Sequence, residues 1–178
     1  MSTFPYQCDD RIFQSFLERQ YAEGIALSNE SDILDLHVAA AAPPHFVADF
    51  HCKGLIKSAA GKIGEADEFR IAIWYPPDSL RRRASTFEMF RMLTPGVFHP
   101  NVSPELPLIC LGNLAAGNSL VDIIHRLYEV ITYQRWNPVE TDSLNRAACS
   151  WARRHQEMFP LERSTLRRQR LNLEVQAV

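Results

Sequence analysis

The sequence lacks several features that would mark particular classes of protein. No apolar run approaches the ~20 residues that are needed to span a bilayer. The N-terminal stretch MSTFPYQCDDR has neither a basic start nor an apolar core, so it does not fit a secretory signal. A formal net charge of −2 at pH 7 provides no global basic field that would attract nucleic acid. We therefore expect a cytoplasmic protein that binds neither membrane nor nucleic acid.

Cysteine is scarce and widely spaced. The chain contains Cys8, Cys52, Cys110 and Cys149. None of them forms a Cys-x-x-Cys pair, so neither a disulfide framework nor a zinc ribbon is expected. The pairs His51-Cys52 and Cys149-His155 lack further ligands, and we predict no metal and no cofactor. Apart from Cys110, the cysteines are interpreted as small apolar residues.

What is present fits an ordinary globular protein. A length of 178 residues with 46% apolar residues suffices for one domain with a sizeable core. We place this domain at residues 1–160 and a basic C-terminal tail at residues 161–178. Two arginine clusters, one at residues 81–83 and one in the tail, are either solvated faces or docking surfaces.

Hydrophobic periodicity predicts the order of the elements. Apolar residues at helical spacing indicate a helix over residues 9–27, with Asp9 and Asp10 at its start. Period-two alternation indicates strands, and residues 58–65 are interpreted as a connection. Ser119 is expected to cap a helix that runs to about residue 133, and Asp142 a last helix that ends before Pro160. The expected strands are residues 33–38, 46–52, 69–75 and 86–93.

This order defines a fold class. Successive strands with short links form an antiparallel meander, and helices can cover one of its faces. We therefore predict an α+β domain: an N-terminal helix, a four-stranded antiparallel meander, a loop that carries the candidate site, and two C-terminal helices.

The stretch FHPNVSPELPLICL at residues 98–111 is the part of the chain that indicates chemistry. It contains the triplet His99-Pro100-Asn101, then a proline-rich loop, then Cys110 among apolar neighbours. Sulfur is a good nucleophile and a good leaving group, so a thiol held near an amide and an imidazole can perform acyl transfer. The prolines stiffen the loop, which such chemistry requires.

This stretch resembles the active-site segment of ubiquitin-conjugating enzymes, which carries His-Pro-Asn, a short loop and Ile-Cys-Leu. Further along, Asn137-Pro138 and the run from Asp142 to Asn145 are similar to the family's Asn-Pro and Asp-Asp-Pro-Leu-Asn sequence. The motifs cover residues 69–151, and the order of the elements extends the match over most of the chain. Together they are fairly specific, although either alone is weak.

The resemblance implies a role for each matching residue. Cys110 would accept a ubiquitin-like modifier protein as a thioester from an activating enzyme, and pass it to an amine of a protein substrate. Asn101 would either donate its amide to the oxyanion or brace the loop, and His99 would set the turn. Asp142 matches the acidic residue near the incoming lysine and could also cap the helix, with Glu140 as a second candidate. The chain alone would be a monomer.

Departures from the family pattern indicate a divergent branch. The interval from Asn101 to Cys110 is one residue longer than usual, and Gly112-Asn113 stands where Asp is common after Cys-Leu. The chain is similar to bacterial conjugating-enzyme-like proteins, which are encoded with ubiquitin-like proteins and activating-enzyme homologues, often in antiviral defence islands.

Lysine is also rare, since Lys53, Lys57 and Lys62 are the only lysines beside many arginines. An enzyme that carries a thioester gains from few lysines, because each is an acceptor for its own cargo. Genomic codon bias explains the same count more simply.

Two alternatives remain open. One is a non-catalytic module of the same fold that binds ubiquitin-like proteins, against which the presence of Cys110 argues. The other is a cysteine peptidase that uses Cys110 and His99. Most such enzymes place the cysteine at the start of a helix, whereas Cys110 lies in an extended apolar run.

Overall fold

Helix α1 (Arg11–Asn29) begins after Asp10, whose carboxylate accepts hydrogen bonds from the backbone N–H groups of Ile12 and Phe13. The computed structural model, which describes residues 4–39 and 45–168, confirms the predicted helix with both ends displaced slightly toward the C-terminus. Phe13, Phe16 and Leu17 form its buried stripe. Within the described part of the chain, no helix is both long and apolar enough to cross a membrane.

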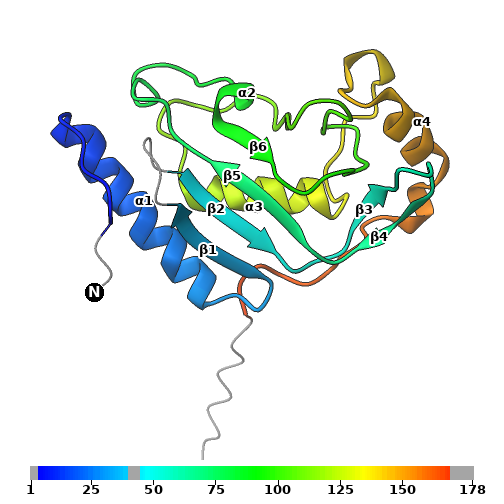
Figure 1. Cartoon of the computed structure of the whole chain (residues 1–178), viewed down its shortest axis with the longest axis horizontal. Coiled ribbons are helices and arrows are strands. Elements are labelled where there is room, and N and C mark those ends of the chain that lie inside the picture. Colours follow the sequence, from blue (N-terminus) through cyan, green and yellow to red (C-terminus); the bar gives the residue numbers. More distant parts are fainter. Residues whose placement is uncertain (1–3, 40–44, 169–178) are drawn as a thin grey trace, which may run out of the picture.

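A four-stranded antiparallel sheet forms the centre of the molecule, in the order β1-β2-β5-β6 (Figure 1). Its strands are β1 (Leu34–Ala39), β2 (His45–Phe50), β5 (Phe69–Ile73) and β6 (Phe90–Met92). Neighbours in the sheet follow one another along the chain apart from one intervening hairpin, so the predicted meander is confirmed. Alternate residues such as Leu36, Phe46 and Ile71 are buried on one face.

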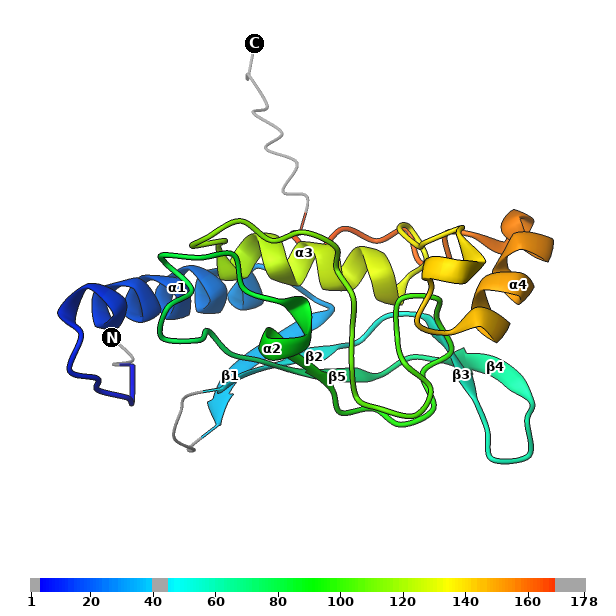
Figure 2. The same ribbon diagram turned by 90° about the horizontal axis from the view of Figure 1, so that it is seen from above.

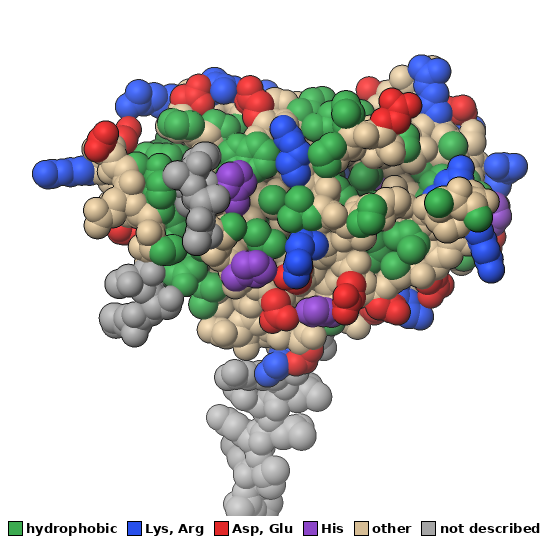
Figure 3. Space-filling model, viewed as in Figure 1, with side chains coloured by type: hydrophobic (Ala, Val, Ile, Leu, Met, Phe, Trp, Pro, Cys, Tyr) green, Lys and Arg blue, Asp and Glu red, His purple; other side chains and the backbone are tan. Residues whose placement is uncertain are grey.

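The opposite face of this sheet carries charged, histidine and aromatic side chains. Arg70 makes a two-pronged ion pair with Asp49, and His51 lies 2.9 Å from the Asp35 carboxylate. The Arg91 guanidinium lies over the Trp74 ring at 4.9 Å from its centroid. Figure 3 shows this face, over which basic, acidic and histidine side chains are scattered among apolar ones.

Helices α1 and α3 (Leu120–Ile131) cover the buried face of the sheet (Figure 2). Ser119 caps α3 as predicted, accepting a hydrogen bond from Asp122 N. Gln20 of α1 is fully buried, and its side-chain oxygen accepts from Leu120 N at 2.6 Å, which ties the two helices together. At Gly24 an added Cβ would approach side-chain atoms of Leu36 and Leu120 within 3.0 Å, so the helix and the sheet meet closely there.

Two segments differ from the sequence prediction. The expected connection at residues 58–65 contains most of strand β4 (Ile63–Ala66), which pairs with β3 (Gly54–Lys57) in a separate two-stranded sheet. The expected strand at residues 86–93 begins instead as helix α2 (Thr86–Met89) and becomes β6 only at Phe90. A capping box between Ser85 and Glu88 explains the helical turn, because it satisfies the backbone N–H groups at the helix start.

The start of the last helix also corrects the prediction. Helix α4 spans Arg146–Arg154, and Asn145 caps it by accepting a hydrogen bond from Ala148 N at 3.0 Å. Asp142 is therefore not the cap; it ends a short 3₁₀ turn, η1 (Glu140–Asp142). A second turn, η2 (Gln156–Met158), precedes Pro160.

Residues 161–168 pack on the domain. Leu166 is 2% exposed and belongs to the main core. Arg168 N donates to Glu30 O at 2.9 Å, and the Arg168 side chain pairs with Asp32. Residues 161–168 of the sequence-assigned tail thus reach the turn between α1 and β1.

Candidate active site

His99 forms the buried base of the loop that leads to Cys110. Its side chain is 1% exposed, its ring lies 4.3 Å from that of Tyr133, and its Nδ1 accepts a hydrogen bond from Asn101 N at 3.0 Å. Burial lowers the pKa of His99 to about 3, although the backbone of Arg135 acts in the opposite direction. The buried imidazole is therefore a weak proton acceptor whose Nδ1 is already engaged by Asn101 N, which disfavours a peptidase that uses His99 as its base.

Asn101 closes the loop onto Cys110. The backbone N–H of Cys110 donates to Asn101 O at 2.8 Å, and Val102 and Ile109 form a β-bridge just inside this pair. The side-chain Nδ2 of Asn101 donates to the backbone carbonyl of Cys110 at 2.9 Å. Cys110 is a free, partly exposed thiol. The backbone and side-chain hydrogen bonds between Asn101 and Cys110 therefore fix the position of Cys110 at the end of the loop.

Asn137 joins this loop to the segment that carries Asp142. Its backbone N–H donates to Asn101 Oδ1 at 2.9 Å, and its side-chain Nδ2 donates to Asp142 Oδ2 at 2.9 Å. Its Oδ1 accepts from Val139 N at 2.9 Å, and its carbonyl accepts from the Cys149 thiol at 3.4 Å. A continuous chain of hydrogen bonds therefore runs from the Cys110 carbonyl through Asn101 and Asn137 to the Asp142 carboxylate.

The four residues that the sequence nominated, His99, Asn101, Cys110 and Asp142, are thus connected in space. Glu140 lies at the opposite end of η1, and its carboxylate makes no hydrogen bond or ion pair to any described residue. Sequence reasoning quoted Asn137 only as part of a motif, and interpreted Cys149 as merely apolar. The place of Asn137 in the Asn-Pro pair is the sequence signal that could have identified it as part of the site. No sequence pattern indicates that Cys149 contacts Asn137.

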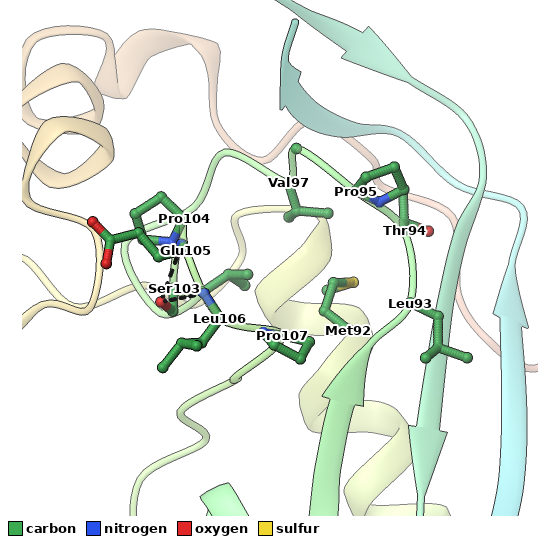
Figure 4. A pocket seen from close by; sticks show the side chains of 12 residues that line it. Met92, Leu93, Thr94, Pro95, Val97, Ser103, Pro104, Glu105, Leu106 and Pro107 are labelled. Carbon is green, nitrogen blue, oxygen red and sulfur yellow. Dashed lines mark hydrogen bonds between the residues drawn. The ribbon is translucent and has the colours of Figure 1, made fainter. Parts of the chain in front are cut away.

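A groove of about 320 Å³ lies between residues 92–97 and residues 102–107, the latter within the loop that leads to Cys110 (Figure 4). Leu93 and Leu106 line it and are 48% and 57% exposed. Ser103 Oγ accepts from the backbone N–H groups of Glu105 and Leu106, which shapes the tip of the loop. Glu105 contributes the one charged side chain among the lining residues.

The site and the fold define a class: an α+β domain that presents one cysteine thiol on a braced loop, with a carboxylate fixed through the same network. No family model matches the sequence, and none of the curated proteins matches it. Solved structures do match. One is a Plasmodium yoelii protein described as a candidate ubiquitin conjugating enzyme, at 16% identity and a TM-score of 0.53, with 88% of this chain and 92% of that chain covered. The chain therefore has a ubiquitin-conjugating-enzyme-like fold.

Proposed function

We propose that the protein is a conjugating enzyme that receives a ubiquitin-like modifier as a thioester on Cys110 and transfers it to an amine of a target protein. The observation that carries the proposal is the hydrogen-bond chain from the Cys110 carbonyl through Asn101 and Asn137 to Asp142. These hydrogen bonds hold the Asp142 carboxylate at a fixed position relative to the segment that carries the partly exposed Cys110. Preorganisation of this kind is what acyl transfer between large partners requires.

The first step is thioester exchange. The Cys110 thiolate attacks the acyl carbon of the modifier, which an activating enzyme carries as a thioester; a new C–S bond forms and the thiolate of the activating enzyme leaves. The leaving and attacking groups are chemically alike, so this step needs little activation of Cys110.

The second step is aminolysis. A lysine amine of the acceptor attacks the Cys110 thioester, a C–N bond forms, the C–S bond breaks, and the amine proton is lost. Lysine has a pKa of ~10.4 and is mostly protonated near neutral pH. Asp142 orients the incoming amine and helps to remove its proton. Asn101 braces the loop through its side-chain oxygen and one side-chain N–H. Its second side-chain N–H donates to the negatively charged oxygen that develops when the amine attacks the thioester.

The partners that follow from this activity are a ubiquitin-like modifier, its activating enzyme and a protein acceptor. We place the activity in the cytoplasm, and in a divergent bacterial conjugation system with a role in antiviral defence. The departures at Gly112-Asn113 and in the length of the Cys110 loop support a divergent branch.

The test is to incubate the protein with a ubiquitin-like protein, the activating enzyme of that modifier and ATP, and to compare gels with and without thiol reductant. We expect a reductant-sensitive adduct that Cys110→Ala abolishes and that Cys8→Ala, the matched change at another partly exposed cysteine, retains. An adduct that persists in Cys110→Ala would contradict the assignment. A folded protein that binds the modifier without any adduct would instead be a non-catalytic binding module.

A further inference from the structure

The groove shown in Figure 4, which we call the loop groove, combines a buried apolar floor with two exposed leucines. Met92, Val97 and Val102 line it and are almost fully buried. Leu93 on one side and Leu106 on the other leave about half of their surface in solvent. A concave apolar surface that the protein covers only in part is typical of a site for another molecule.

Hydrogen bonds within the protein hold both sides of the loop groove in place. Met92 N donates to Pro107 O at 3.0 Å, which joins β6 to the loop. Ser103 N donates to Leu108 O at 3.0 Å, and the Ser103 hydroxyl accepts from two N–H groups at the tip of the loop. Three of the lining residues are prolines, whose φ is fixed. The groove is therefore formed before a partner binds, so binding does not have to order its walls.

Glu105 gives the loop groove a negatively charged rim. It is the one charged residue among those that line the groove, and Figure 4 shows its side chain extending outward from the loop. Glu105 is exposed, and its carboxylate makes no hydrogen bond or ion pair with any residue in the described part of the chain. A bound segment therefore gains from an arginine or lysine side chain at this rim, and an acidic side chain there is repelled.

The loop groove is close to the candidate nucleophile. Val102, in its floor, forms an antiparallel β-bridge with Ile109, the residue before Cys110. Opposite residues in such a pair have Cα atoms about 4.5–5.5 Å apart, and neighbours along the chain have Cα atoms about 3.8 Å apart. The Cα atoms of Val102 and Cys110 therefore lie within about 10 Å of each other. An extended segment advances about 3.3 Å per residue, so about three residues cover this distance.

We propose that the loop groove docks the acceptor protein, by holding a segment about three residues away from the lysine that is modified; this rests on the proposed function. The segment carries apolar side chains that contact Leu93 and Leu106, and a basic side chain that pairs with Glu105. Docking accelerates transfer by raising the local concentration of the amine at the Cys110 thioester. The amine nitrogen then bonds to the acyl carbon, the C–S bond breaks, and the released Cys110 thiolate takes up the proton lost from nitrogen.

The modifier is the other molecule that could fill the loop groove. The charge favours the acceptor, since a segment that contains a lysine always brings positive charge toward Glu105. Charging of Leu106→Ser by the loaded activating enzyme separates the two occupants. Slower charging of this variant, with an unchanged choice of acceptor, would assign the groove to the modifier and overturn the proposal.

The experiment lets the loaded full-length protein choose among peptides. All proteins carry Cys8→Ala, so that Cys110 is the partly exposed thiol that reacts. The acyl donor is the mercaptoethanesulfonate thioester of acetyl-Ala-Gly-Gly, which gel filtration removes after charging. The acceptors are a mixture of peptides with one central lysine and four varied residues on each side, drawn from Leu, Arg, Glu and Ser, so that both directions of docking are sampled. Mass spectrometry then identifies the acylated peptides, and we expect enrichment of Leu about three residues from the lysine and of Arg over Glu.

Two variants alter the loop groove, and the readout for each is the rate of discharge to the selected peptide divided by the rate of discharge to free lysine. Leu106→Ser should lower this ratio about tenfold, since it removes the burial of part of a leucine. Glu105→Arg should reverse the preference, so that peptides with Glu are selected over peptides with Arg. The matched controls are Ile12→Ser and Glu157→Arg, which change an exposed aliphatic side chain and an exposed carboxylate outside the groove and should match the parent.

A loaded protein that acylates all peptides equally would overturn the proposal. A preference that both Leu106→Ser and Glu105→Arg leave unchanged would overturn it as well, as would acylation of the peptides that persists in Cys110→Ala. An equal loss toward peptide and free lysine would show that the groove supports Cys110 without docking the acceptor. A folded protein that never forms the Cys110 thioester would instead contradict the proposed function, and the docking role with it.

Discussion

The side-chain amide of Asn101 donates a hydrogen bond of 2.9 Å to the backbone carbonyl of Cys110. The oxygen of the same amide accepts from the backbone N–H of Asn137 at 2.9 Å. One side chain thus links the residue that would carry the acyl group to the segment that carries the candidate carboxylate. Four predictions concern this network and its supports.

Asn101→Ala leaves the Cys110 carbonyl and the Asn137 N–H without these partners. Unpaired polar groups of this kind cost about 1–3 kcal/mol when they are buried. We therefore expect lower stability in urea unfolding, and slower rates both for charging of Cys110 and for discharge. Single-turnover measurement of each step checks this. Full stability with a loss confined to discharge would show that Asn101 acts on the oxyanion and does not brace the loop.

Asp142→Asn should slow discharge of loaded Cys110 to free lysine near neutral pH, and recover in part as pH rises. The reason is that free amine becomes abundant toward the lysine pKa of ~10.4, so help with its proton matters less. The variant retains an oxygen that can accept the bond from Asn137 Nδ2. Glu140→Gln is the control on the same turn and should match the parent. If Glu140→Gln is slow and Asp142→Asn is not, the acidic residue is Glu140.

His99 should make the protein less stable in mild acid. Its pKa falls from 6.5 to about 3 on folding, so between these values the unfolded chain binds a proton that the folded chain does not. The free energy of unfolding then decreases as pH falls through this window, by up to ~1.4 kcal/mol per pH unit from this residue. His99→Asn keeps an acceptor for Asn101 N and cannot titrate. Urea unfolding at pH 4 to 7 should give a shallower slope for the variant; equal slopes would contradict the prediction.

Asn145→Ala should destabilise the domain by about 1 kcal/mol, since it removes the side-chain acceptor at the start of α4. Asp142→Ala is the matched change at the residue that the sequence suggested as the cap. Asp142→Ala should lower the stability measured by thermal unfolding less than Asn145→Ala does, because Asp142 caps no helix and is exposed. A larger loss for Asp142→Ala would reverse this order of importance.

Most of the fold follows from local patterns. The stripe of Phe13, Phe16 and Leu17 and the alternation around Leu36 and Ile71 reflect one buried face, and the sequence shows that directly. The β3–β4 hairpin escaped prediction because its strands are short and β4 contains Gly64. Strands as short as these are stabilised mainly by pairing with each other, and the sequence carries no clear signal for that pairing.

The start of α4 could not be chosen from sequence, since Asp142 and Asn145 are both good capping residues. Tertiary contacts decide it: Asn137 engages the Asp142 carboxylate, while the Asn145 N–H is held by Pro100 O. The same holds for the candidate site. Motifs nominated Cys110, Asn101, His99 and Asp142, but only spatial proximity makes Asn137 the residue that connects them.

The docking of Arg168 beside Glu30 and Asp32 fixes the position of the last described residue. That point is next to β1, at one edge of the central sheet, whereas Pro107 of the Cys110 loop bonds to β6 at the other edge. Figure 1 shows the red end of the chain emerging on the side of β1. A fluorophore or a biotin attached at residue 168 would therefore lie at the opposite edge from the Cys110 loop, so protein immobilised through it can be loaded and discharged on a sensor surface.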